Sequence, residues 1–132
     1  MRVDLDLSGD LPKLQLDQDA ISRVLINLIK NAIEAKQEKM QLNINIKSIL
    51  KEKDGFVQLT ITDDGKGFPS DIIDQVFEPY ITTKERSGGL GLAIVQNIIE
   101  QHDGQIFASN AKPHGARVTI ELSIIENPKG AK

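Results

Sequence analysis

Two asparagines stand four residues apart in a segment with helical periodicity, Asn27 and Asn31. This spacing places both on one side of a helix, beside its apolar stripe. Asparagine is a weak helix former, and its amide oxygen can coordinate a hard cation such as Mg²⁺. The pair therefore indicates a ligand site, although two partly exposed polar side chains would explain the same spacing.

A second candidate is the run Asp63-Asp64-Gly65-Lys66-Gly67 at the end of an alternating apolar segment. The Asp63 carboxylate accepts hydrogen bonds and can recognise an exocyclic amine. Gly65 and Gly67 let the chain turn sharply and approach a ligand closely. When the run is taken alone, an ordinary turn that ends a strand is the better explanation.

A third candidate is the glycine-rich run Gly88-Gly89-Leu90-Gly91-Leu92, which leads into an apolar helix. Backbone N–H groups at a helix start favour phosphate, but the run is not a P-loop and a simple hinge is the alternative. The preceding loop, 79–89, has no periodicity and contains Thr83 and Lys84. A loop of this length in a compact domain is typical of a lid or a binding loop.

The elements that position these residues follow from the spacing of apolar side chains. Spacings of three and four residues predict helices at 18–37 and 90–101, the second closed by Gly104 as its C-cap, with a shorter helical pattern at 71–77. Alternation predicts strands at 2–7, 14–16, 42–47, 57–61, 105–109 and 116–125. Two helices that each need an apolar partner favour an α+β fold, a two-layer sandwich with both helices on one face of the sheet.

The composition excludes several classes of function. The chain has 132 residues, enough for one domain, a net charge of -3, no cysteine and two histidines. Disulfides, thiolate chemistry and His-rich metal sites are therefore excluded, and a basic nucleic-acid surface is not indicated. No apolar run is long enough to span a membrane, and no signal peptide opens the chain. His102 and His114 lie in predicted helix-end and turn positions, which favours a structural or surface role for both.

The candidate runs occur in an order that resembles the catalytic and ATP-binding domain of sensor histidine kinases, within the Bergerat-fold ATPases and closest to the nitrogen-regulation type. The matching segments are 27–32 for the N box, 63–68 for the G1 box, 77–80 for the F box and 89–95 for the G2 box, with Gly115 as the final glycine motif. The resemblance covers nearly the whole chain. It implies a mixed sheet, a domain over 1–125 and a flexible tail over 126–132.

The resemblance also implies a role for each site residue. Asn31 coordinates Mg²⁺, Asn27 lies close to the phosphates, and Asp63 accepts a hydrogen bond from the adenine amino group. The adenine pocket is shaped by Gly65, Gly67 and Phe68. The loop 79–89 is the ATP lid, where Lys84 contacts the γ-phosphate and Thr83 adds a hydroxyl. The phosphates are cradled by Gly89, Leu90, Gly91 and Leu92.

The first N-box position bears on the reaction. By resemblance, gyrase-like ATPases and serine kinases of this fold carry glutamate there, as a general base. Asn27 cannot accept a proton at neutral pH, and a histidine acceptor with a pKa of about 6.5 has less need of a base in this domain. This favours transfer to histidine over hydrolysis. The chain departs from the family pattern at two positions. Glu34 stands three residues after Asn31, where the family often has a cationic side chain that contacts phosphate. Ser87 stands where the family often has the first glycine of the G2 box, at the hinge of the lid.

The resemblance implies partners as well. The acceptor histidine belongs to a separate helical dimerisation domain, a response regulator acts downstream, and the isolated domain is a monomer. We expect a cytoplasmic domain, whether or not the inner membrane anchors the full-length protein. Two alternatives stay open: a Bergerat-fold ATPase or serine kinase, and a non-enzymatic module that senses nucleotide.

Overall fold

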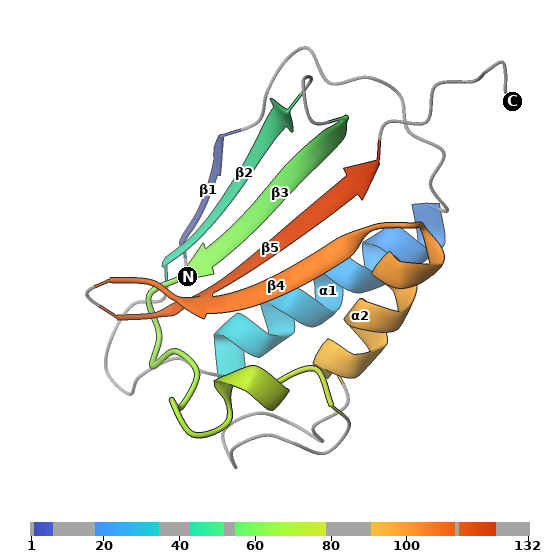
Figure 1. The fold of residues 1–132 in the computed structure, drawn as a ribbon. Helices are drawn as coiled ribbons and strands as arrows, with labels where there is room; N and C mark the ends of the chain where they lie inside the picture. The colour runs from blue at the N-terminus through green and yellow to red at the C-terminus, as the bar shows by residue number, and fades with distance from the viewer. Residues whose placement is uncertain are drawn as a thin grey trace, which may run out of the picture.

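A five-stranded sheet carries two helices on one face (Figure 1). The computed structural model describes residues 2–6, 18–34, 43–51, 55–78, 91–112 and 114–123. The strands are β1 (Arg2–Asp6), β2 (Asn43–Lys51), β3 (Phe56–Asp63), β4 (Gln105–Asn110) and β5 (Ala116–Ser123). The helices are α1 (Gln18–Glu34), α2 (Gly91–Gln101) and the 3₁₀ helix η2 (Ile73–Gln75). The predicted α+β two-layer sandwich is confirmed.

The sheet is mixed, with strand order β1-β2-β3-β5-β4. β1 and β2 pair in parallel, and α1 lies between them in the chain, as a parallel crossover requires. The other neighbouring strands pair antiparallel. In the β2–β3 hairpin Ile44 lies opposite Asp63, so the strand end that carries Asp63 adjoins the beginning of β2.

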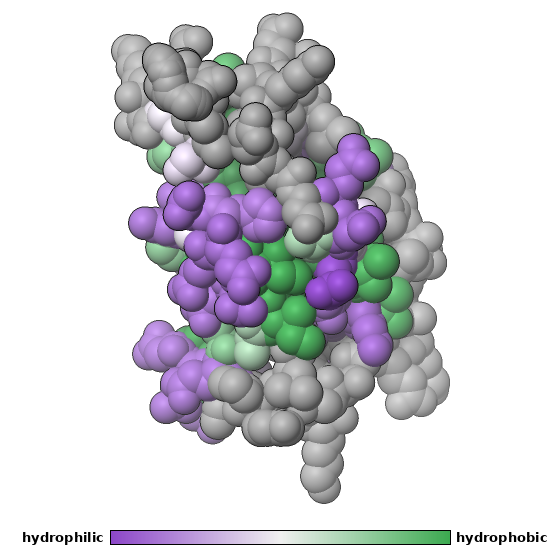
Figure 2. Space-filling model, turned by 90° about the vertical axis from the view of Figure 1, so that its right-hand side faces the viewer, coloured by the Kyte–Doolittle hydropathy of each residue, from purple (hydrophilic) through white to green (hydrophobic). Residues whose placement is uncertain are grey.

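The core lies between the helices and the sheet. α1 contributes Val24, Leu28 and Ala32, which recur at intervals of four and are each at most 3% exposed. α2 contributes Leu92, Val95, Ile98 and Ile99, and the strands contribute Ile44, Ile61, Ile106, Val118, Ile120 and Leu122. Burial of one such side chain stabilises the fold by roughly 1.5–3 kcal/mol. On the side of the molecule in Figure 2, apolar side chains form a narrow band flanked by hydrophilic ones.

The end of α2 corrects one prediction. The residue with left-handed backbone is Asp103, with φ of 58°, and not Gly104. Gly104 N–H donates to the Ile99 carbonyl at 2.9 Å and Asp103 N–H to the Glu100 carbonyl at 3.1 Å, which is the Schellman arrangement. Gly104 is small for another reason: a β-carbon there would lie 2.6 Å from the Glu121 carbonyl oxygen in β5.

Other boundaries differ slightly from the prediction. The helical pattern at 71–77 is only the short 3₁₀ helix Ile73–Gln75, held by successive i to i+3 hydrogen bonds that begin at Pro69. α2 is described from Gly91 onward, and the predicted first residue of this helix, residue 90, lies outside the described residues. The predicted strand at 14–16, the helix end at 35–37, the strand end at 124–125 and the tail at 126–132 lie outside the described residues. Among the described helices, none is both long and apolar enough to cross a membrane.

Candidate functional site

Asp63 is a carboxylate set into the apolar face of the sheet. It continues the inward series of Val57, Leu59 and Ile61 along β3, because alternate residues of a strand share one face. Its side chain is only 8% exposed. Its Oδ1 accepts hydrogen bonds from the backbone N–H of Gly65 at 2.8 Å and of Ala116 at 3.2 Å. These bonds satisfy one oxygen and fix the direction of the carboxylate.

The turn after Asp63 is packed closely against the β4–β5 hairpin. Gly67 has φ of +81° and Gly115 has φ of +114°, which L side chains rarely adopt. A β-carbon on Gly115 would overlap the Asp63 carbonyl oxygen. The final glycine motif therefore lets the hairpin approach the Asp63 backbone, a role that the sequence did not reveal.

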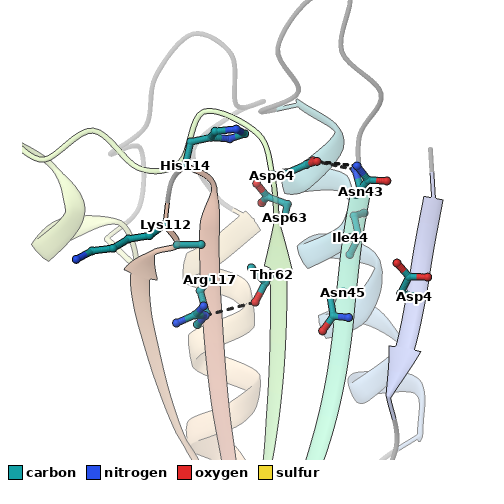
Figure 3. A pocket seen from close by; sticks show the side chains of 11 residues that line it. Asp4, Asn43, Ile44, Asn45, Thr62, Asp63, Asp64, Lys112, His114 and Arg117 are labelled. Carbon is teal, nitrogen blue, oxygen red and sulfur yellow. Dashed lines mark hydrogen bonds between the residues drawn. The ribbon is translucent and has the colours of Figure 1, made fainter.

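Asp64, next to Asp63, ties this turn to β2 (Figure 3). Its two carboxylate oxygens accept hydrogen bonds from Asn43, one from the backbone N–H at 2.8 Å and one from Nδ2 at 2.7 Å. Partial burial by itself would raise the pKa of Asp64. The hydrogen bonds from Asn43 and from its own backbone, with the nearby His114, outweigh that effect and hold the pKa below the ordinary 3.8. Asp64 therefore acts as a structural anion.

The inner side of Asp63 meets α1 across a small cavity. Its lining includes Asn31, Asp63 and Phe68, together with Leu28, Ile61, Ala116 and Val118. Its volume is about 10 Å³, room for about one water molecule. The structure thus brings an N-box asparagine, the G1 aspartate and Phe68 into one apolar pocket, which must widen before a planar ring can enter.

Asn27 lies one helical turn before Asn31 and faces the start of α2. Its Nδ2 donates to the Arg23 carbonyl at 2.9 Å. Its Oδ1 lies 3.5 Å from the position that a β-carbon on Gly91 would occupy. Backbone N–H groups of the first turn of a helix, and the positive end of the helix dipole, point out of its N-terminus. The N box and the beginning of α2 therefore border one space suited to an anion.

The remaining predicted residues are placed unevenly. Leu92 follows Gly91 in the first turn of α2, but its side chain is buried in the core and 7% exposed, so only its backbone is suited to a phosphate. The other predicted ligands, Thr83, Lys84, Gly89 and Leu90, lie outside the described residues, as do the end of the F box and the lid.

The oxygen ligands available among the described residues fit a Mg²⁺ ion. Among the described residues there is no cluster of three or more His, Cys, Asp or Glu side chains that could hold a metal by itself. Mg²⁺ at nucleotide sites needs only one or two protein oxygens, because phosphates and water complete its shell. Asn31, half-buried and lining the pocket, offers one amide oxygen of the required kind.

Two further residues, which the sequence did not indicate, contact the site. His114 Nδ1 lies 3.2 Å from the Gly65 carbonyl, and Asn110 pairs with the backbone of Phe68. Their partners are 49 and 42 residues away in the chain, so no local pattern could have revealed either contact. His102 Nδ1 lies 2.8 Å from the Ile98 carbonyl. Both histidines thus contact backbone carbonyls, in line with the structural role expected for them.

The open face of the sheet carries a larger and more polar cavity beside the same turn (Figure 3). Its volume is about 340 Å³. Its lining includes the outward side chains Asp4, Asn45, Thr62, Lys112 and Arg117, and Arg117 Nε donates to Thr62 Oγ1 at 3.4 Å. The mixed charges of this lining favour no single ligand, and the smaller pocket remains the candidate site.

Comparisons with known proteins agree with this arrangement. A family model described as histidine kinase-, DNA gyrase B- and HSP90-like ATPase matches residues 16–125. Sensor histidine kinase ZraS of Escherichia coli O157:H7 is 40% identical over 114 residues, which cover 86% of this chain and 24% of that protein. A putative NtrY-like sensor histidine kinase of Rickettsia conorii is 37% identical over 116 residues, or 88% and 19%. The chain thus spans a quarter or less of these relatives.

A solved structure extends the likeness to the fold. The catalytic domain of histidine kinase ThkA superposes with a TM-score of 0.73 at 31% identity, over 92% of this chain and 80% of that one. The matched family region contains every residue that lines the smaller pocket, together with Asn27 and Gly91. The chain therefore belongs to the family of histidine kinase-, DNA gyrase B- and HSP90-like ATPases, as an ATP-binding catalytic domain of the sensor histidine kinase type.

Proposed function

We propose that this chain binds ATP with Mg²⁺ beside α1, the first turn of α2 and the end of β3. In its full-length protein it transfers the γ-phosphoryl group to a histidine of a separate helical dimerisation domain. One observation supports transfer to histidine in particular. The side chain that faces Gly91 is the uncharged amide of Asn27, so a general base is lacking at that position.

The pocket at Asp63 is suited to the base. An anchored carboxylate at the end of an apolar cavity accepts a hydrogen bond from an exocyclic amine, and the surrounding side chains contact the ring faces. Phe68 and Leu28 supply that apolar contact. Because the cavity holds only about 10 Å³, entry of adenine requires these side chains to move.

The phosphates then extend toward Asn27 and Gly91. The N–H groups and dipole of the first turn of α2 stabilise their charge. The Asn31 amide oxygen holds Mg²⁺, which supplies further neutralisation of the phosphates. By their resemblance to the family, Gly89 and Leu90 complete the cradle, and Thr83 and Lys84 contact the phosphates from the lid.

The transfer balances without a base from this chain. A neutral imidazole nitrogen of the acceptor attacks the γ-phosphorus, the bond from phosphorus to the bridging oxygen of ADP breaks, and the imidazole proton leaves to solvent. At an ordinary pKa of about 6.5 this imidazole is largely neutral at pH 7. The domain therefore contributes positioning and charge stabilisation.

Transfer to the chain's own dimerisation domain tests the proposal. The purified chain is mixed with that domain and with ATP labelled in its γ-phosphate. We expect label on the helical domain that is stable to base and labile to acid, as a phosphohistidine is, with little release of free phosphate. Asn27→Asp places a carboxylate beside the phosphates and should abolish most of the labelling, whereas Asn97→Asp, on the exposed side of α2, should not.

Other outcomes select other functions. Rapid release of phosphate without labelling would indicate an ATPase, and nucleotide binding with neither reaction would indicate a sensing module. Undiminished labelling by N27D would remove Asn27 from the mechanism. We further propose that the domain works in the cytoplasm, is monomeric without the dimerising helices and passes phosphate onward to a response regulator.

A further inference from the structure

The structure assigns to Asn110 a positioning role in nucleotide recognition. Asn110 is the last residue of β4. Its Oδ1 accepts a hydrogen bond from the Phe68 N–H at 2.7 Å, and its Nδ2 donates to the Phe68 carbonyl at 2.9 Å. One carboxamide thus satisfies both polar backbone groups of a residue at the end of the G1 turn.

These two hydrogen bonds pair the Asn110 side chain with the Phe68 backbone, much as a neighbouring strand would pair with it in a sheet. The segment after Gly67 belongs to no strand. The two Asn110 bonds join the N–H and the carbonyl of Phe68 to the last residue of β4. A partly buried backbone group that loses its hydrogen bond is costly, so Asn110 fixes the backbone of Phe68 relative to β4.

Gly67 and Asn110 fit one another. A β-carbon on Gly67 would lie 2.8 Å from Asn110 Oδ1, so the glycine leaves room for the amide to reach the backbone behind it. Gly67 also holds φ of +81°, which directs the chain from the Asp63 turn back toward β4. The second G1 glycine therefore serves the contact with Asn110 as well as the turn.

The effect reaches the ligand through Phe68. Its side chain is 5% exposed and lines the small pocket together with Asp63 and Asn31. Asn110 does not line that pocket. Loss of the two Asn110 hydrogen bonds would release the Phe68 backbone and let the Phe68 ring shift. The pocket proposed for the adenine base would then be less well defined. Asn110 acts through Phe68 and is a positioning residue rather than a catalytic one.

This inference rests on the proposed binding of adenine nucleotide. Its test compares the dissociation constants of ADP and GDP for the wild-type chain and for Asn110→Ala, by calorimetry, at a temperature where each variant is fully folded. We expect N110A to bind ADP roughly three- to tenfold more weakly, the equivalent of one or two lost hydrogen bonds, and to prefer ADP over GDP less strongly than the wild type.

Two variants separate positioning from mere destabilisation. Ile106→Val removes one methyl group from the core at β4, at a residue that does not line the small pocket, and lowers stability by roughly 0.5–1.5 kcal/mol. It should leave both dissociation constants unchanged. Asn110→Asp keeps an acceptor for the Phe68 N–H but sets a carboxylate against the Phe68 carbonyl, so it should weaken ADP binding at pH 7. This variant carries the test if N110A fails to fold.

Hydrogen exchange gives a readout without nucleotide. In N110A the Phe68 amide should exchange faster while the β4–β5 amides keep their protection. Suppose that the wild-type chain binds ADP, and that N110A binds ADP with the same affinity and the same preference over GDP. Asn110 then has no positioning role; if N110A does not fold, the same result with N110D leads to the same conclusion. Failure of the wild-type chain to bind ADP would instead overturn the proposed function.

Discussion

Asn27 faces Gly91 across the space between α1 and α2: a β-carbon on Gly91 would lie 3.5 Å from the Asn27 Oδ1. The N box and the first turn of the second long helix, 64 residues apart in the sequence, thus meet side by side. That distance is an ordinary van der Waals contact, so an added methyl group would fit. Steric conflict with Asn27 is therefore not the reason for a glycine at this position.

Gly91→Ala should separate stability from ligand binding. Alanine favours a helix over glycine by up to about 1 kcal/mol, with less gain at the first residue, so the variant should melt at the same temperature as wild type or higher. The methyl group occupies space proposed for the phosphates, and affinity for ADP should fall. Thermal unfolding and calorimetry check the two effects, and unchanged ADP affinity would remove Gly91 from the phosphate site.

The Asp63 carboxylate should control which base binds. Asp63→Asn keeps an acceptor for the N–H groups of Gly65 and Ala116 but exchanges the other oxygen for an amide donor. We expect the fold to persist, ADP to bind at least tenfold more weakly, as expected when a charged hydrogen bond is lost, and the preference over GDP to shrink. Asp63→Ala should also lose stability, by about 1–3 kcal/mol, because buried N–H groups lose their acceptor.

Periodicity predicted most of the architecture. Strand alternation located the β2–β3 hairpin, and the pairs of apolar residues in 18–37 located α1, because burial on one face leaves a strong local signal. The order of the motifs in the sequence also predicts that Asn31 and Asp63 belong to one site, and both residues line the small pocket. Asn31 adjoins the buried apolar residues of α1, and Asp63 continues the inward-facing residues of β3. The spacing of those apolar residues in the sequence predicts which face of each element is buried.

Contacts between distant segments could not be predicted in this way. Nothing near Asn110 indicates that its amide pairs with Phe68, and nothing near Gly115 indicates that it packs on the Asp63 carbonyl. The sequence predicts Gly104 as the C-cap of the second helix, because glycine is the usual residue at that position. In the structure Asp103 adopts the left-handed conformation, and close packing against the Glu121 carbonyl requires the glycine at 104. Such features depend on tertiary neighbours rather than on local preference.

The Asp64–Asn43 contact should make stability depend on pH at the acidic end. Because the folded-state pKa of Asp64 lies below 3.8, its contribution is present above the unfolded value and is lost as pH falls through the folded value. The free energy of unfolding should therefore drop below about pH 4. In Asp64→Asn this drop should be smaller and stability at pH 7 lower.

A double-mutant cycle assigns that pH effect to the contact itself. Asn43→Ala removes the Nδ2 donor and should reproduce part of the loss at pH 7. Combined with Asp64→Asn it should cost less than the sum of the two single changes, as expected for residues in direct contact. Strict additivity in urea unfolding would show that Asp64 acts on stability through other groups.

Neighbouring residues at the end of α2 should respond to substitution in opposite directions. Asp103→Gly relieves a left-handed conformation that costs a residue with a side chain roughly 1–2 kcal/mol. The greater backbone entropy that glycine loses on folding offsets part of this gain, so the domain should be stabilised by about 0.5–1 kcal/mol. Gly104→Ala places a β-carbon 2.6 Å from the Glu121 carbonyl oxygen, and should destabilise it by about 1–3 kcal/mol, as overpacking does. Urea unfolding at pH 7 measures both. If Gly104→Ala proved neutral, α2 would not pack this tightly on β5, and if Asp103→Gly proved destabilising, the Asp103 side chain would contribute more than its backbone strain costs.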